Sequence, residues 1–309
     1  MRRTTPSRAR LALVALGTGV AVVAAALPAM ADATATAGQA AVAVQRGSRA
    51  GVIQFLVQRG QTLPPLRSTA AAYKADVTVP IGDVDRSFRV FVPPGLTGPA
   101  PTVVAMGGLG LTGDPELYMG WQRLAVAKKF VVIYARGDGA SYNAGRCCGP
   151  AVGRKIDDSA ALLRMLEVES TLYPQDRSRL YVTGYSNGGM MAYRFACEHP
   201  GLVAAIGVVG GAYMARGDCM PTSPVPVMHV HGKLDRTVPY GGTPWSKLLK
   251  TSIPSVAQTN AVFGRVNARY GVPVKNVNLA GVGHGWPHPV GSRYDTTAEL
   301  AAFLLRFRR

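Results

Sequence analysis

Gly184-Tyr185-Ser186-Asn187-Gly188 is the most informative stretch of this 309-residue chain. It follows an apolar run at 180–183 and precedes a helical pattern that begins near Met190. A sharp strand-to-helix turn crowds its own backbone, and glycines two residues before and after the apex relieve that crowding. Ser186 is therefore predicted to stand at the apex as a candidate nucleophile, with the N–H groups of the following helix turned toward it. An ordinary strand–helix turn is the competing interpretation, because small residues cluster by chance in a chain with 36 glycines.

Short β-branched runs alternate with helical patterns from about Tyr73 onward. This alternation predicts a mostly parallel sheet covered by helices on both faces. Strands are expected at 75–79, 87–92, 102–106, 130–135, 180–185, 204–209, 225–230 and 274–279, and helices near 117–128, 157–172, 188–198, 255–270 and 294–308. The first two strands flank the short segment 82–86 and are expected to pair as a hairpin. Eight strands with the candidate nucleophile after the fifth resemble the α/β-hydrolase fold.

A serine hydroxyl becomes an effective nucleophile only when a base takes its proton. His284 lies in the glycine-rich segment 281–287, directly after the last expected strand, and is the predicted base; His288 is the alternative. His199 is expected to cap the end of the helix that follows the turn. His229 and His231 alternate along a strand, where core packing is expected. A metal site is the alternative for this pair, but no third ligand is apparent.

A carboxylate must orient the base, and in this fold it lies between the nucleophile and the histidine along the chain. Asp235 directly follows an expected strand, 49 residues after the serine and 49 before the histidine. Glu198 lies at the far end of its helix and Asp218 lies in a loop, so Asp235 is the predicted acid. A turn-capping role is the alternative for Asp235.

Two backbone N–H groups must stabilise the negative charge that forms on the substrate. Asn187, directly after the nucleophile, is expected to provide one of them. The other is expected from Gly107-Gly108-Leu109-Gly110, which follows an early strand. Glycines there let the backbone approach a substrate closely. A tight strand–helix turn is a compatible interpretation of the same segment.

The first 31 residues have the pattern of a secretory signal peptide. An apolar stretch at 11–28 leads to a small-residue cleavage site at Ala29-Met30-Ala31, and it is preceded by four arginines, Arg2, Arg3, Arg8 and Arg10. An uncleaved membrane anchor is the alternative, and both general and twin-arginine export stay open. Residues 32–72 are expected to form a linker or flexible arm, with one short helix possible at 52–57. The α/β-hydrolase domain is expected at 73–309 of a secreted protein that has no membrane span after cleavage.

The formal net charge of the chain is +17 and falls to +13 without the four leader arginines. A basic exported protein can bind acidic polysaccharide, an anionic surface or nucleic acid. The arginines are scattered, with no run of five basic residues and no interleaved aromatic residues. We therefore expect no nucleic-acid partner.

Four cysteines, an even number, suit disulfide bonds in an oxidising compartment. They are Cys147, Cys148, Cys197 and Cys219. A bond between the two adjacent cysteines would strain the peptide, so two longer bridges from Cys147 and Cys148 to Cys197 and Cys219 are expected. A zinc site is the alternative, although adjacent cysteines do not have the usual ligand spacing.

From about Tyr73 to Arg309 the chain resembles the esterase family that contains poly(3-hydroxybutyrate) depolymerases, feruloyl esterases and acetyl xylan esterases. The resemblance rests on four motifs in order, at 143–149 with 156–158, at 184–190, at 231–240 and at 283–287. It implies that Ser186, Asp235 and His284 form a catalytic triad. It also implies that Gly108 and Asn187 provide the two oxyanion N–H groups and that Trp286 forms one wall of the acyl pocket. Two segments depart from the family, since Met106-Gly107 replaces its His-Gly pair and its late Trp and Asn-Gly-Cys are altered to Phe263 and Tyr270-Gly271.

The resemblance implies a serine esterase that works through an acyl-enzyme, without cofactor or metal. The expected partner is a small or oligomeric ester, of the polyhydroxybutyrate, feruloyl or acetyl type, and the protein is expected to act as a monomer. A peptidase of the same fold is the enzymatic alternative. A secreted binding protein on a hydrolase scaffold is the non-enzymatic one, for which a broken triad would be the sign.

Overall fold

The computed structural model describes residues 42–46, 52–111, 115–215, 219–290 and 293–309. The expected signal peptide at 1–31 and the first part of the expected arm, 32–41, lie outside the described residues. Residues Ala37–Arg309 belong to one compact unit. Within its described part, no helix is long and apolar enough to cross a membrane.

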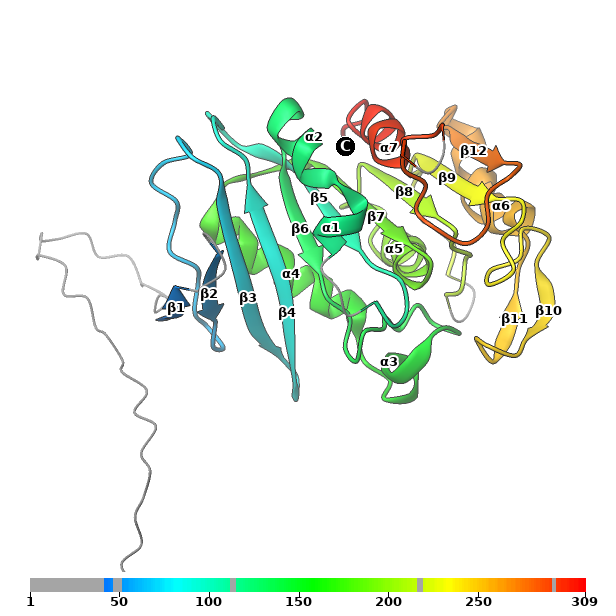
Figure 1. The fold of residues 1–309 in the computed structure, drawn as a ribbon, viewed down its shortest axis with the longest axis horizontal. Helices are drawn as coiled ribbons and strands as arrows, with labels where there is room; N and C mark the ends of the chain where they lie inside the picture. The colour runs from blue at the N-terminus through cyan, green and yellow to red at the C-terminus, as the bar shows by residue number, and fades with distance from the viewer. Residues whose placement is uncertain (1–41, 47–51, 112–114, 216–218, 291–292) are drawn as a thin grey trace, which may run out of the picture. The chain divides into compact units, whose positions relative to one another are not determined.

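Ten strands of the described residues form one sheet in the order β1-β2-β3-β4-β6-β5-β7-β8-β9-β12 (Figure 1). The strands are β1 (Val42–Arg46), β2 (Val52–Leu56), β3 (Tyr73–Ile81), β4 (Val84–Val92), β5 (Ala100–Met106), β6 (Val131–Ala135), β7 (Gln175–Tyr185), β8 (Ala205–Val209), β9 (Val227–Gly232) and β12 (Val274–Leu279). β3 and β4 form the expected antiparallel hairpin, and β4 pairs antiparallel with β6. From β6 through β5, β7, β8 and β9 to β12 every pairing is parallel.

The predicted α/β-hydrolase fold is confirmed, since the eight expected strands occur in this sheet with the nucleophile turn after the fifth of them. β5, β6 and β8 are buried at every position. Parallel strands covered on both faces show this continuous burial. Helices cover both faces, and the serine turn lies at the carboxyl end of the central strand β7.

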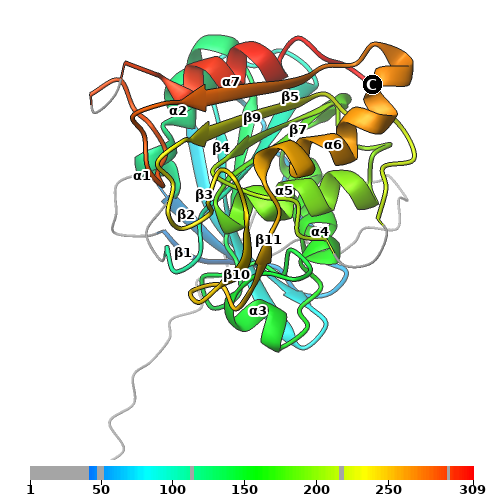
Figure 2. The same cartoon turned by 90° about the vertical axis from the view of Figure 1, so that its right-hand side faces the viewer.

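Helices lie in two layers, α2 and α7 on one face of the sheet and α4, α5 and α6 on the other (Figure 2). The helices are α1 (Pro115–Met119), α2 (Trp121–Lys128), α3 (Gly149–Gly153), α4 (Asp158–Leu172), α5 (Asn187–Glu198), α6 (Val256–Asn267) and α7 (Thr296–Leu304), with a 3₁₀ turn at Ala268–Tyr270. Alternate strand residues separate the two cores: Val103 packs with Trp121 and Leu300, while Val104 packs in the cluster that holds Phe195. A separate hairpin, β10 (Thr243–Ser246) with β11 (Thr251–Ile253), lies between β9 and α6.

The interpretation of residues 52–72 as a linker or flexible arm is wrong. The short helix considered at 52–57 is the strand β2, which pairs parallel with β3 and thus extends the sheet beyond the eight expected strands. Val57 and Leu63 after it are fully buried, and the N–H of Leu66 donates to the carbonyl of Leu172 at 2.9 Å. The β-branched and aromatic residues of 52–56 fit a half-buried strand once the edge of β3 is available to pair.

The expected disulfide pairing is also wrong. Cys147 is bonded to Cys148, and Cys197 on α5 is bonded to Cys219. The Cα atoms of Cys197 and Cys219 lie 6.2 Å apart, within the usual range for a disulfide. Because Cys197 and Cys219 are bonded to each other, neither is available to Cys147 or Cys148. The side chains of Cys147 and Cys148 are buried in the same core cluster as residues of α5.

Candidate active site

Ser186 occupies the turn between β7 and α5 with a backbone φ of 53° and ψ of −120°. A positive φ is costly for a residue with a side chain and persists only where the surroundings enforce it. The N–H of Ser186 donates to the carbonyl of Val209 at 2.8 Å, which ties the turn to β8. A Cβ at Gly184 or Gly188 would overlap neighbouring backbone atoms, and one at Gly189 would lie 2.9 Å from a Val208 methyl. The glycines therefore allow the close packing that holds the serine at the apex.

The three predicted site residues lie in one hydrogen-bonded line. Nε2 of His284 is 3.0 Å from Oγ of Ser186, and Nδ1 of His284 is 2.7 Å from Oδ2 of Asp235. Ser186 and Asp235 are buried, and the His284 side chain is 17% exposed. A base between a hydroxyl and a buried carboxylate can take the hydroxyl proton while the carboxylate stabilises the resulting cation. His284, of the two histidines considered, makes these contacts.

The carboxylate of Asp235 is held by four donors. Oδ1 accepts the N–H groups of Thr237 at 2.9 Å and Val238 at 2.8 Å, while Oδ2 faces His284 and lies 3.3 Å from Nε2 of His231. Burial by itself would raise the pKa of Asp235, but hydrogen bonds from His231 and His284, with that from Val238, hold this pKa below its ordinary value. The acid is thus ionised at neutral pH and fixed in orientation.

Two buried histidines, His231 and His229, extend the contacts of Asp235 into the core. Nδ1 of His231 lies 2.9 Å from Nε2 of His229, and Nδ1 of His229 lies 2.8 Å from the hydroxyl of Tyr193. Nε2 of His231 also lies 2.8 Å from the carbonyl of Val238, an acceptor, so this nitrogen carries a hydrogen. Burial, followed by the influence of His231, lowers the pKa of His229 to about 3.

Sequence reasoning placed His229 and His231 in the core, and both are indeed fully buried, but it missed the contact with Asp235. The sequence does hold an indication of this contact, since His231 lies near the end of β9 and Asp235 follows it by four residues, just after the strand. A tight turn there brings the two side chains together, with the N–H of Asp235 donating to the carbonyl of Gly232 at 3.2 Å.

The two expected oxyanion segments lie beside Ser186. A Cβ at Gly108 would be 3.1 Å from the Tyr185 ring and 3.3 Å from Cβ of Ser186. Asn187 is the first residue of α5, so its N–H has no partner within the helix. The Asn187 side chain has a further role that could not be predicted from the sequence, because it holds the backbone of Tyr142. Its Oδ1 accepts the N–H of Tyr142 at 2.7 Å, and its Nδ2 donates to the carbonyl of Tyr142 at 2.9 Å.

The loop at 142–149, which begins at this contact with Asn187, is anchored at several further points. The N–H of Asn143 donates to Oδ2 of Asp158 at 2.6 Å, and Arg194 on α5 donates to the Asn143 carbonyl at 2.5 Å. Asp158 is itself buried in an ion pair with Arg86 at 2.5 Å. The motif residues at 143–149 and 156–158 therefore fix this loop against the start of α5.

Trp286 lines a hollow of about 470 Å³ formed by segment 281–288 and Val290, directly beside His284. The indole is buried, and its N–H donates to the hydroxyl of Thr297 on α7 at 3.0 Å. Trp286 therefore connects the histidine loop to α7 and presents part of its ring to the hollow. This hollow therefore adjoins His284.

Two of the remaining candidates, Glu198 and His199, lie at the end of α5 that is far from Ser186. His199 follows α5 and lies 2.9 Å from the hydroxyl of Ser159, and Glu198 pairs with Arg194. Asp218 lies outside the described residues. His288 follows His284 in the loop that lines the hollow.

Several known proteins are similar in sequence or structure to this chain. A family described as phospholipase/carboxylesterase matches residues 153–262. The chain is 26% identical over 216 residues to a bifunctional acetylxylan esterase/xylanase of Neocallimastix patriciarum, covering 64% of this chain and 31% of that protein. It is 25% identical over 256 residues to poly(3-hydroxyalkanoate) depolymerase C of Paucimonas lemoignei, covering 69% and 62%.

A solved structure of a thermostable esterase aligns with 76% of this chain and 63% of its own, at a TM-score of 0.52 and 18% identity. At that identity the similarity concerns the fold alone. The chain spans between about a third and three fifths of the length of the curated relatives it matches.

Proposed function

We propose that the chain is an esterase of the α/β-hydrolase superfamily that hydrolyses carboxylic esters through a covalent ester of Ser186. One observation carries the proposal, the line from Oγ of Ser186 through His284 to Asp235 at 3.0 and 2.7 Å. It stands at the strained turn where the fold presents its nucleophile. The relatives named as esterases support the same chemistry.

In the proposed reaction Oγ of Ser186 attacks the ester carbonyl while its proton passes to Nε2 of His284. The N–H groups of Gly108 and Asn187 stabilise the oxyanion. The C–O bond to the alcohol then breaks, and His284 returns the proton to the departing alcohol. Water repeats the sequence on the acyl-enzyme, which releases the acid and restores the serine. Asp235 holds the imidazole in place and stabilises its cation at each stage.

The proposed substrate class is a soluble or oligomeric ester of the hydroxyalkanoate, feruloyl or acetyl type. The names of two relatives, an acetylxylan esterase and a hydroxyalkanoate depolymerase, motivate the acetyl and hydroxyalkanoate types. The feruloyl type rests on the resemblance of the sequence motifs alone. The hollow of about 470 Å³ beside His284, walled in part by Trp286, is the proposed acyl site. Its volume suits a group of drug size or smaller.

We place the enzyme outside the cytoplasm. The signal-like pattern at 1–31 motivates this, and the disulfide bonds suit an oxidising compartment. N-terminal sequencing of the protein recovered from culture medium tests it, with Asp32 expected as the first residue. Retention of the leader on cell-associated protein would contradict it.

A substrate panel tests the activity. Purified protein is given polyhydroxybutyrate suspension, methyl ferulate, acetylated xylan and nitrophenyl esters of increasing acyl length, with an acyl-peptide nitroanilide as the amide control. We expect turnover of at least one ester and a serine-directed phosphonate label on the peptide that contains Ser186. Turnover of the amide alone, or a label on another serine, would contradict the proposal.

A further inference from the structure

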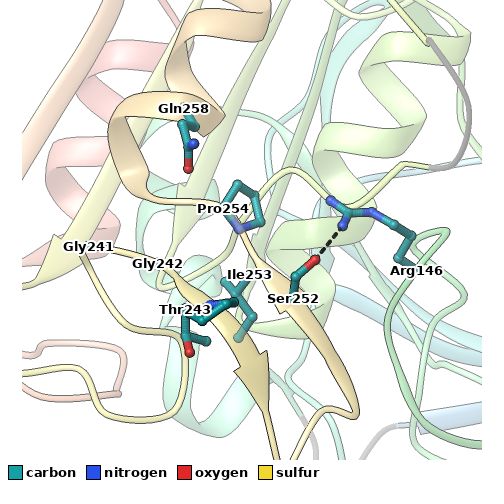
Figure 3. A pocket seen from close by; sticks show the side chains of 9 residues that line it. Arg146, Gly241, Gly242, Thr243, Ser252, Ile253, Pro254 and Gln258 are labelled. Carbon is teal, nitrogen blue, oxygen red and sulfur yellow. Dashed lines mark hydrogen bonds between the residues drawn. The ribbon is translucent and has the colours of Figure 1, made fainter.

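A second hollow, a groove of about 410 Å³, opens between the loop before α3 and the β10–β11 hairpin. Figure 3 shows Arg146 on one wall, with Ser252 and Pro254 facing it and Gln258 above. Of the described residues that line it, Arg146 alone carries a charge. The groove is therefore a positively charged site that shares no lining residue with the hollow beside His284.

The guanidinium of Arg146 is positioned rather than free in solvent. Its Nη1 donates to Oγ of Ser252 at 3.0 Å, and its backbone N–H donates to the carbonyl of Met214 at 2.8 Å. Across the described part of the chain no carboxylate pairs with it, whereas many other arginines do have acidic partners, among them Arg86, Arg123, Arg179 and Arg194. Its remaining N–H groups are thus available to an anion from solution.

Other polar groups on the walls suit the same ligand. The oxygen of the Gln258 side chain accepts the N–H of Ser255 at 2.8 Å, which leaves its amide nitrogen as a further donor. The planar guanidinium fork matches a carboxylate through two parallel hydrogen bonds. A carboxylate is therefore the ligand chemistry that this groove fits.

Two chain segments connect the groove with the reacting residues. A Cβ at Gly210 would lie 3.4 Å from Nδ1 of His284, and four residues later Met214 accepts the backbone N–H of Arg146. Four residues span at most about 14 Å even when fully extended. On another side, the groove wall at 241–244 follows the loop that leaves Asp235. An ester of a few units could therefore place its carbonyl at Ser186 and its end in the groove.

We propose that this groove, through Arg146, binds a free carboxylate carried by the ester substrate whose carbonyl lies at Ser186. This inference rests on the proposed esterase activity and narrows its substrate class. The preferred substrates are acid-ended esters, such as short oligomers of hydroxy acids, over neutral esters of the same length. Because the groove is open to solvent, we expect the contact to raise affinity by roughly tenfold, which is less than a buried charged pair can contribute.

The test compares pairs of similar esters in which only one member carries a free carboxylate. The first pair is a 3-hydroxybutyrate trimer with a free carboxyl end and the same trimer with a primary amide end, which places the charge on the alcohol side. The second pair is 4-nitrophenyl hydrogen glutarate and 4-nitrophenyl butyrate, which places it on the acyl side. Each is measured with the wild type, with Arg146→Leu and with Arg269→Leu, an exposed arginine on the 3₁₀ turn at Ala268–Tyr270 that removes the same charge elsewhere.

The wild type is expected to favour the acid in at least one pair, by roughly tenfold in kcat/KM. Arg146→Leu should abolish that preference through KM and leave the neutral esters within about twofold, while Arg269→Leu should keep it. Equal loss on acid and neutral esters, or no preference in either pair, would overturn the inference while leaving the esterase proposal intact. Absence of turnover on every ester would instead remove the proposed function itself.

Discussion

Nε2 of His231 lies 3.3 Å from Oδ2 of Asp235, the same carboxylate oxygen that meets His284 at 2.7 Å. His231 thus contacts Asp235 from within the core, whereas His284 contacts it from the side of Ser186. His231 is in turn held by His229 and by the carbonyl of Val238. A donor at this position fixes the carboxylate and favours its ionised form, so we expect His231 to be a positioning residue for the reaction.

Replacing His231 tests that expectation. His231→Leu removes the donor from Asp235, and we expect kcat to fall by roughly 10-fold to 100-fold with KM little changed. The pKa of Asp235 loses one of the influences that lower it, so Asp235 takes up its proton at higher pH.

His231→Gln is the matched rescue, because its amide nitrogen can occupy the place of Nε2 and donate as the imidazole did. It should recover most of kcat. The groups that also titrate or face this region are His229, Tyr193, Tyr240 and Tyr185, and all four stay unchanged. His199→Leu, a histidine bonded to Ser159 instead, is the control. A loss of kcat in His231→Leu that His231→Gln does not recover, or that His199→Leu matches, would show that His231 has only a structural role.

Asn187→Ala is expected to destabilise the fold as well as slow the reaction. It removes the two hydrogen bonds to the backbone of Tyr142, at 2.7 and 2.9 Å, and leaves the buried N–H of Tyr142 without its partner, while the Tyr142 carbonyl keeps the N–H groups of Ala144 and Cys148. One unpaired buried donor costs about 1–3 kcal/mol, so the free energy of unfolding should fall by roughly that amount. Urea unfolding measures it, with the exposed Asn276→Ala as control. Equal midpoints for the two variants would contradict the anchoring role of Asn187.

Removing the bridge between α5 and Cys219 should lower stability without stopping turnover. The two cysteines are 22 residues apart in sequence, and loop closure of that length stabilises a fold by about 3 kcal/mol. The double variant Cys197→Ser/Cys219→Ser should therefore lose an amount of that order in chemical denaturation and keep kcat within a few-fold. Unchanged stability would show that the bridge does not constrain the unfolded chain.

Glu169 on α4 should make stability depend on pH. Burial raises the pKa of this fully buried carboxyl to about 8, although the hydrogen bond from Gln175 acts to lower it. Between its ordinary value, about 4.5, and about 8 the folded state binds a proton that the unfolded state has lost. The free energy of unfolding therefore falls with rising pH, by about 1.4 kcal/mol per pH unit from this group.

Glu169→Gln keeps the shape and the acceptor for Gln175 but has no proton to lose. Its stability relative to the wild type should increase steadily between about pH 5 and pH 8, because all other titrating groups are shared. Thermal unfolding of both proteins across that range measures the difference. A constant difference between the two would show that Glu169 ionises in the folded state as it does in the unfolded one.

Much of the fold and of the candidate site could be predicted from the sequence because both depend on local order. The strand runs, the glycines around Ser186, and the positions of Asp235 and His284 directly after strands are all visible along the chain. The structure brings these three side chains together at the carboxyl ends of the strands. Local patterns were sufficient there.

Features that depend on distant partners could not be predicted in this way. The strand β2 needs the free edge of β3, and an apolar run of five residues suits a strand or a helix until that edge is known. The cysteine pairing depends on the approach of Cys219 to α5, and four cysteines allow three pairings. The contact of His231 with Asp235 and the position of Arg146 beside Ser252 likewise arise only when separate loops meet.

The turnover of Ser186→Ala tests the central claim most directly. The variant removes only the hydroxyl that His284 meets at 3.0 Å, and it should fold as the wild type does. With 4-nitrophenyl butyrate, or the best ester of the panel, kcat should fall by several orders of magnitude, roughly 10⁴-fold or more. Circular dichroism and the unfolding midpoint should stay unchanged. A folded Ser186→Ala protein that hydrolyses the ester within tenfold of the wild-type rate would contradict the account.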